Sequence, residues 1–254
     1  MEAQTNRIAV FEDTLRHIRT SWQKEVSYSI AHQRCILEKD ILPPLSKPSF
    51  QTNIIVSSLR SFEAAAQYKN QRVAVLNFAS ATHPGGGVKH GSAAQEEALC
   101  RVSTLFPCLN DSLMWNQFYT PHQQVHTPLY NSDIIYTPEV VVFKDDDYHL
   151  LKEPFKVNVI TCAAPNLRYT PTPENLLQIH EQRARRIFHV AVEQNDILIL
   201  GAFGCGAFRN DPTIVARAYK NVLSEFLGHF KTIEFAVYCN TFDKTNYNAF
   251  SKIL

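Results

Sequence analysis

The stretch from Val73 to Leu105, VAVLNFASATHPGGGVKHGSAAQEEALCRVSTL, constrains the fold of this 254-residue chain more than any other. It begins as an apolar strand, breaks at three consecutive glycines, Gly85, Gly86 and Gly87, and resumes as a helix pattern. Glycine loses the most backbone entropy on folding, so a triple glycine is costly inside regular structure. We therefore expect a loop whose backbone adopts positive φ or lies against a large ligand.

Two adjacent carboxylates follow the glycines at the start of the predicted helix. Ser92 and Gln95 have the spacing of a capping box, with Ser92 at the N-cap, so Glu96 and Glu97 fall in or just beyond the first turn. Acidic residues at this point often only complement the helix dipole. Their place directly after a glycine loop favours a functional site. The dipole lowers the pKa of such a carboxylate, whereas a neighbouring carboxylate and an incoming diphosphate raise it.

The rest of the chain predicts an α/β fold. A helix-like N-terminal arm spans about 8–41, and apolar runs then alternate with helix patterns from Thr52 onward. Such apolar strands are covered on both faces, which indicates a three-layer α/β/α sandwich with a parallel or mixed sheet. We expect a helical accessory segment over 1–50 and one domain over 51–254. The predicted strands are 53–57, 72–79, 140–143, 157–164, 196–200 and 233–239; the predicted helices are 59–69, 93–107, 173–194 and 212–227; and 145–147 is predicted to be a solvated turn.

A second glycine cluster, GAFGCGAF over 201–208, follows the strand at 196–200. In α/β sandwiches ligands bind beyond the carboxyl ends of the strands, where glycine-rich amides and helix N-termini hold phosphate. Two such loops predict a ligand with more than one phosphate, held by backbone rather than by Lys or Arg. For Gly204 to Gly206 alone, a tight strand-to-helix turn is the alternative. The P-loop and G-x-G-x-x-G patterns are both absent from the sequence.

The composition disfavours proteins that bind nucleic acid, membranes or zinc. Lys and Arg number 25 against 24 Asp and Glu, so no overall field attracts nucleic acid or a membrane. The six cysteines form no C-x-x-C pair, which disfavours zinc and indicates buried thiols in a reducing compartment. Signal-peptide and membrane-span patterns are absent. We expect an intracellular monomer, cytoplasmic or nuclear in a eukaryote, without metal or cofactor. An effector exported without a cleaved signal would have the same features.

Together these motifs resemble those of poly(ADP-ribose) glycohydrolases. Gly85 to Gly87, seven residues, then Gln95-Glu96-Glu97 is similar to the GGG-x(6–8)-QEE signature of that family, and the surrounding run is most similar to its smaller microbial type. DIIYTPEVVVFK at 133–144, CAAPN at 162–166 and GAFGCGAFRNDP at 201–212 resemble later blocks of the family. The resemblance covers about 50–245. It implies a macrodomain fold and hydrolysis of ribose–ribose O-glycosidic bonds. We expect hydrolysis from the terminal unit of ADP-ribose polymers, and cutting inside the chain stays open.

The resemblance also implies a role for each matched residue. Glu97 would be the catalytic acid/base, and Glu96 would bind ribose hydroxyls and position the scissile ribose. The three glycines would contact the diphosphate and distal ribose, while Gln95 supports their loop. The other implied substrate contacts are Asn77, Gly204, Cys205, Gly206, Ala207 and Phe208, the last of which would pack on the terminal ribose. For Asn77, a buried amide at a strand end is the competing interpretation.

Two further functions stay open from the sequence. The protein could be a macrodomain that binds ADP-ribose without hydrolysing it. Alternatively, it could remove a single ADP-ribose from a protein or nucleic acid. The carboxylate pair favours the hydrolase, because a binding module has no need of it. The expected partners are ADP-ribose or its polymers on modified proteins, as in reversal of ADP-ribosylation during a DNA damage response, with no direct contact to duplex nucleic acid. The adenine-contacting tyrosine insertion of the larger animal enzymes has no counterpart that we can locate.

Overall fold

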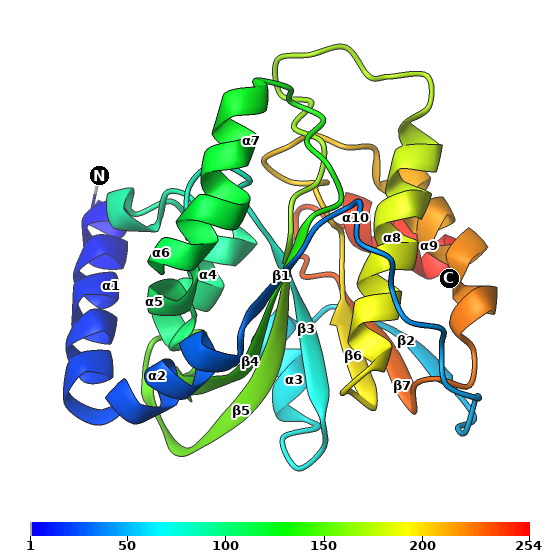
Figure 1. Cartoon of the computed structure of the whole chain (residues 1–254). Helices are drawn as coiled ribbons and strands as arrows, with labels where there is room; N and C mark the ends of the chain where they lie inside the picture. The colour runs from blue at the N-terminus through cyan, green and yellow to red at the C-terminus, as the bar shows by residue number, and fades with distance from the viewer. Residues whose placement is uncertain (1) are drawn as a thin grey trace.

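The computed structural model describes residues 2–254 and places a seven-stranded mixed sheet between two layers of helices (Figure 1). The sheet order is β1-β4-β5-β3-β6-β7-β2. The β1–β4 and β4–β5 pairs are antiparallel, and every pair from β5 to β2 is parallel. This confirms the predicted α/β/α sandwich with a mixed sheet. The strands are β1 Arg34–Ile36, β2 Asn53–Ser57, β3 Val73–Phe78, β4 Ile134–Lys144, β5 Leu150–Cys162, β6 Ile197–Leu200 and β7 Thr232–Ala236.

The central strands are buried on both faces, as their apolar sequences predict. In β3, Ala74 and Leu76 belong to one hydrophobic core, and Val73 and Val75 belong to the other, because successive side chains of a strand point to opposite faces. The first core is covered by α8 Leu176–Val192, α9 Pro212–Phe226 and α10 Thr245–Ile253. The second is covered by α1 Glu2–Ser21, α3 Ser61–Ala66, η1 Val88–His90, α4 Gln95–Val102, α5 Leu105–Leu109, α6 Ser112–Met114 and η2 Trp115–Tyr119.

The parallel strands bring the two glycine loops together. β3 pairs with β6, with Val73 opposite Ile197 and Val75 opposite Ile199. The two strands therefore end at the same edge of the sheet, and residues 79–94 and 201–211 leave that edge side by side. Asp211 then caps α9 by accepting a hydrogen bond from Thr213 N, and Pro212 occupies the first helical position, where the sequence predicts that the helix begins.

The N-terminal arm, predicted as a helical accessory segment, contains a strand as well as helices. It forms α1, then α2 (Gln23–His32), and then strand β1, which pairs with β4 at the edge of the sheet. The strand is three residues long, too short for an alternating pattern to indicate it. The arm is therefore not purely helical. No helix within residues 2–254 has the length and apolar character needed to cross a membrane.

Several other boundaries also needed correction. The segment predicted as one helix over 93–107 is split, because Ser103 is extended (φ −146°) and forms a bridge with Val142 of β4. The capping box at Ser92 is wrong, because α4 begins at Gln95 with Ala94 at its N-cap. The helix expected from residue 173 begins at Leu176. The β4–β5 hairpin is much longer than predicted. The predicted turn at 145–147 lies between β4 and β5. The remaining helix is α7, Thr120–Val125.

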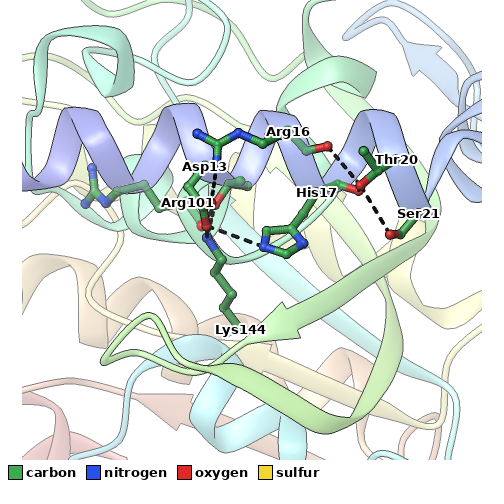
Figure 2. Close-up of polar contacts among 8 residues, drawn as sticks. Asp13, Arg16, His17, Thr20, Ser21, Arg101 and Lys144 are labelled. Atoms are coloured by element: carbon green, nitrogen blue, oxygen red, sulfur yellow. Dashed lines mark hydrogen bonds and ion pairs between the residues drawn. The ribbon is translucent and has the colours of Figure 1, made fainter.

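A buried cation fastens α1 to the sheet (Figure 2). Lys144, at the end of β4, is 3% exposed, and its Nζ donates to Asp13 Oδ2 at 2.7 Å and to Thr14 Oγ1 at 2.9 Å. The Thr14 hydroxyl in turn donates to the backbone oxygen of Arg101 at the end of α4. This chain of contacts joins α1, β4 and α4. The hydrogen bond from Lys144 holds the pKa of Asp13 below its usual value.

We expect Asp13→Ala to destabilise the protein more than Lys144→Met. The first variant leaves a buried ammonium without its carboxylate, whereas the second removes the charge and leaves Asp13 partly solvated. The expected cost of Asp13→Ala is about 2 kcal/mol, less than for a fully buried pair. Urea unfolding measures it. Because the pKa of folded Asp13 is lowered, its contribution is present at neutral pH and is lost on acidification. Equal losses in both variants would contradict this account.

Candidate active site

Glu96 is buried beneath the first glycine loop. It lies in the first turn of α4 and is 2% exposed. Its carboxylate accepts hydrogen bonds from Ser80 N at 2.7 Å, Gly85 N at 3.2 Å and Asn77 Nδ2 at 3.4 Å. Asn77, fully buried near the end of β3, also donates to Thr161 Oγ1 at 3.2 Å. Asn77 therefore supports Glu96 from behind and does not line the cleft.

Glu97 presents its carboxylate differently. Its Oε1 accepts a hydrogen bond from Gly87 N at 2.9 Å. Within residues 2–254 this is the one hydrogen bond that we find to the Glu97 carboxylate, and Glu97 lines the cleft. The two neighbouring glutamates thus have distinct surroundings. Glu96 accepts three N–H donors of the protein, shared between both its oxygens, whereas Glu97 keeps one oxygen for a ligand.

Gln95 joins the start of α4 to the end of β3. Its Oε1 accepts from Phe78 N at 2.9 Å, and its Nε2 donates to Leu76 O at 2.8 Å and Ser61 Oγ at 3.0 Å. A side chain that makes three such bonds fixes the helix start relative to the strand. Gln95 therefore determines where the carboxylates of Glu96 and Glu97 lie relative to the cleft.

The glycine run is required by backbone geometry and by close approach. Gly85 and Gly86 have φ of +67° and +54°, and such positive values are unfavourable for any residue with a Cβ. A Cβ on Gly86 would lie 2.6 Å from Glu97 Oε1 and 3.2 Å from Glu96 Oε2. The loop therefore packs its backbone directly on the carboxylate pair, as the triple glycine predicts.

The second glycine loop is held by a buried amide. Gly204 has φ +77°, and a Cβ there would lie 2.5 Å from Ala164 Cβ. Asn210, 2% exposed, donates from Nδ2 to Gly204 O at 3.0 Å and to Pro165 O at 2.7 Å. Its Oδ1 lies 2.9 Å from His180 Nε2. Burial lowers the pKa of His180 to about 4, so the ring is neutral at pH 7.

Both loops border one cleft of about 460 Å³, a volume typical of small-molecule sites. Arg60 is the one Lys or Arg among the described residues that line it, in keeping with a ligand held by backbone amides. The predicted site residues that line the cleft are Gly86, Gln95, Glu96, Glu97, Gly204, Gly206, Ala207 and Phe208. Gly85 and Gly87 instead hold the carboxylates through their N–H groups. The Cys205 thiol donates weakly to Phe203 O at 3.7 Å and does not line the cleft.

Sequence reasoning missed part of the cleft wall. Asp146, predicted to lie in a solvated turn, lines the cleft because the β4–β5 hairpin folds over it, and burial raises the pKa of this carboxyl. Tyr238 and Asn246 also line it, and the Arg60 guanidinium stacks 4.0 Å from the centre of the Tyr238 ring. No local signal marks these residues, since only the folded sheet brings their segments together.

The ionisation of Glu96 predicts a pH dependence of stability. Burial, reinforced by the Glu97 carboxylate and opposed by the three N–H donors, raises the pKa of Glu96 from 4.5 to about 8. The folded protein thus binds this proton more tightly than the unfolded chain does. Folding then becomes less favourable as pH rises from about 4.5 to about 8.

We expect the free energy of unfolding of the wild type to fall relative to that of Glu96→Gln across this interval. The slope is at most about 1.4 kcal/mol per pH unit. Urea titrations of both proteins between pH 5 and pH 8 measure it. Parallel pH profiles would show that Glu96 titrates normally.

The fold and the cleft define a class of protein. It is an α/β/α domain with a carboxylate pair between two glycine loops, the arrangement expected of a hydrolase that holds a phosphorylated substrate through backbone amides.

Comparison with known proteins identifies the family. The family described as microbial-type PARG, catalytic domain, matches residues 11–145, just over half of the chain and most of its N-terminal arm. The chain belongs to this family of poly(ADP-ribose) glycohydrolases, which confirms the resemblance inferred from the glycine and carboxylate motifs. A comparison with curated proteins finds no match.

Solved structures of similar proteins support this assignment. The poly(ADP-ribose) glycohydrolase from Thermomonospora curvata is 30% identical with a TM-score of 0.87, over 98% of this chain and 100% of that one. The enzyme from Deinococcus radiodurans, solved in complex with ADP-ribose, is 36% identical with a TM-score of 0.79, over 90% of this chain and 96% of that one. The fold is therefore that of the bacterial enzymes.

Proposed function

We propose that this protein hydrolyses the ribose–ribose O-glycosidic bonds of poly(ADP-ribose), acting on the terminal unit and releasing ADP-ribose, with Glu97 as the acid/base. The observation that carries the proposal is the unequal state of the two adjacent glutamates. Glu96 is occupied by three N–H donors, and Glu97 offers a free oxygen to the cleft. A module that only bound ADP-ribose would gain nothing from this arrangement.

The chemistry assigns each carboxylate a step. Glu97, protonated, gives its proton to the departing ribose oxygen as the C–O bond breaks and an oxocarbenium-like ribose forms. The resulting Glu97 carboxylate takes a proton from the water that attacks this carbon, which regenerates the acid. Glu96, held beside Glu97 by its three N–H donors, would contact ribose hydroxyls and position the scissile ribose.

Backbone groups hold the rest of the substrate. Gly86 of the first loop and Gly204, Gly206 and Ala207 of the second line the cleft, and their amides suit the two phosphates of ADP-ribose. Phe208, which also lines the cleft, would pack on the terminal ribose. The Deinococcus radiodurans enzyme of similar structure is solved with ADP-ribose, which supports the same ligand here. Binding energy from the diphosphate can then be used to orient the reacting sugar.

Product analysis tests the proposal. Purified protein is incubated with end-labelled and uniformly labelled poly(ADP-ribose) and, in parallel, with a peptide that carries one ADP-ribose. We expect ADP-ribose as the first product from the polymer and slow or no release from the peptide. Binding without release from either substrate would make the protein an ADP-ribose reader. Oligomers as first products would refute the terminal mode, and faster release from the peptide would indicate a mono-ADP-ribosyl hydrolase.

A further inference from the structure

The end of the first glycine loop is fastened from outside the cleft. Three consecutive backbone carbonyls, at His90, Gly91 and Ser92, each accept a hydrogen bond from a helix side chain. The donors are, in order, Gln4 Nε2 at 2.8 Å, Arg7 Nε at 2.6 Å and Arg101 Nη1 at 2.6 Å. Two of the donors are cationic, and charge-assisted hydrogen bonds are the stronger kind. Two of the three come from α1.

Helix α1 lies directly against this part of the loop. Gly91 has φ +71°, and a Cβ there would lie 2.5 Å from the backbone oxygen of Gln4 and 3.2 Å from Ile8 Cγ1. The loop therefore needs glycine at this position both for its turn and for the approach of the helix. A polar, closely fitted contact of this kind exceeds what is needed to cover a hydrophobic core.

The fastened carbonyls connect to the catalytic carboxylate through backbone hydrogen bonds. His90 N and Ser92 N both donate to Gly87 O, at 2.9 and 3.2 Å. Gly87 N donates to Glu97 Oε1 at 2.9 Å. Gly87, whose amide orients Glu97, is therefore held by the same short segment, residues 90–92, whose carbonyls α1 and Arg101 bind.

A second contact of α1 reaches the other end of the glycine run. The Phe11 ring meets the Phe106 ring edge-to-face, with centroids 5.0 Å apart. Phe106 lies beneath Gly85, where a Cβ would be 2.8 Å from Phe106 Cδ2. Gly85 N is one of the donors to Glu96. Both carboxylates thus depend on loop amides that α1 supports.

We propose that Arg7 and Gln4 of α1 are positioning residues for the reaction. They hold the loop in the conformation that aims the Gly85–Gly87 amides and, through them, the Glu97 carboxylate. The N-terminal arm, which the sequence presents as a helical accessory segment, thereby becomes part of the active-site framework. This inference rests on the proposed hydrolase function, because turnover is its main readout.

Three variants of α1 test this role. Arg7→Met keeps most of the aliphatic stem but removes the donor, Arg7→Lys restores a single donor, and Arg19→Met alters an exposed arginine of the same helix as a control. We expect Arg7→Met to lower kcat on poly(ADP-ribose) about 10- to 100-fold, since displacements near 1 Å at a reacting group cost on this scale. Arg7→Lys should recover part of that loss, and Arg19→Met should match the wild type. KM and Tm should change much less than kcat in Arg7→Met.

Two results would overturn the positioning role. One is wild-type kcat in Arg7→Met. The other is a kcat loss that Arg7→Lys does not recover and that follows the fall in Tm. If the wild type releases no ADP-ribose, the hydrolase proposal itself fails. The affinity for ADP-ribose then tests whether Arg7 holds the loop. A several-fold weaker Kd in Arg7→Met, with Arg19→Met unchanged, would then support the loop-holding role, and an unchanged Kd would refute it.

Discussion

Glu97→Gln is expected to lose about 10²- to 10⁴-fold in kcat while it keeps an ADP-ribose Kd within a few-fold of the wild type. Glutamine cannot exchange a proton with the leaving ribose oxygen or with water. Its amide oxygen can still accept the hydrogen bond from Gly87 N that now lies at 2.9 Å from Glu97 Oε1. We therefore expect the fold and the proposed contacts to the diphosphate to be preserved. Steady-state hydrolysis and calorimetric titration with ADP-ribose measure the two quantities on one preparation.

Glu96→Gln is the matched control for that variant. The Glu96 carboxylate receives N–H donors on both oxygens, so an amide NH2 at this position must face at least one of them. Two buried hydrogen-bond donors that face each other destabilise the fold. We therefore expect a lower Tm and weaker ADP-ribose binding for Glu96→Gln than for the wild type. The two substitutions should thus separate chemistry from loop architecture. The reverse pattern, with stability lost in Glu97→Gln and kcat alone lost in Glu96→Gln, would exchange the two roles.

Gly86→Ala should impair both binding and turnover by at least about 100-fold. Its φ of +54° disfavours any residue with a Cβ, and the added carbon would lie 2.6 Å from Glu97 Oε1. The loop and the carboxylate cannot both keep their places, and misplacement near 1 Å at a reacting group costs about 10²-fold. Hydrolysis rate and ADP-ribose Kd give the measurement.

Gly206→Ala controls for the glycine substitution itself. It lies in the second loop, where a Cβ would meet no atom within 4 Å, and its φ is not positive. Its Tm should equal that of the wild type, so any loss of affinity would report a contact with the ligand. Wild-type kcat and Kd in Gly86→Ala would show that the first loop does not govern the carboxylates.

The sequence predicted the fold where one strong local pattern decided it. The apolar runs that became β3 and β6 were located to within a residue or two, because strands buried on both faces have no polar alternation to obscure them. The edge strand β2, which is only partly buried, was also located correctly. The glycine run and the Gln95-Glu96-Glu97 triplet were placed correctly at a loop and a first helical turn. Local sequence could not assign different roles to two neighbouring glutamates; the family resemblance proposed them, and the hydrogen-bond partners now give a physical reason.

Long-range pairing decided the features that sequence reasoning missed. Ser103 breaks the helix because it bridges to β4, nearly forty residues away in the chain. β1 forms because β4 offers a free edge a hundred residues further on. Asp146 borders the cleft because of the length of the β4–β5 hairpin. At Ser92 the expected cap failed because α1 and Arg101 hold the 90–92 carbonyls in a turn that delays the helix to Gln95.

The most direct test of the central claim is a single-turnover experiment with enzyme in excess over labelled poly(ADP-ribose), run for the wild type and for Glu97→Gln. We predict that the wild type converts the polymer to ADP-ribose, and that Glu97→Gln, although it binds ADP-ribose, releases none over the same period. Release by Glu97→Gln at a rate within about tenfold of the wild type, less than the loss expected for a missing acid/base, would contradict the assignment of Glu97 as the catalytic group.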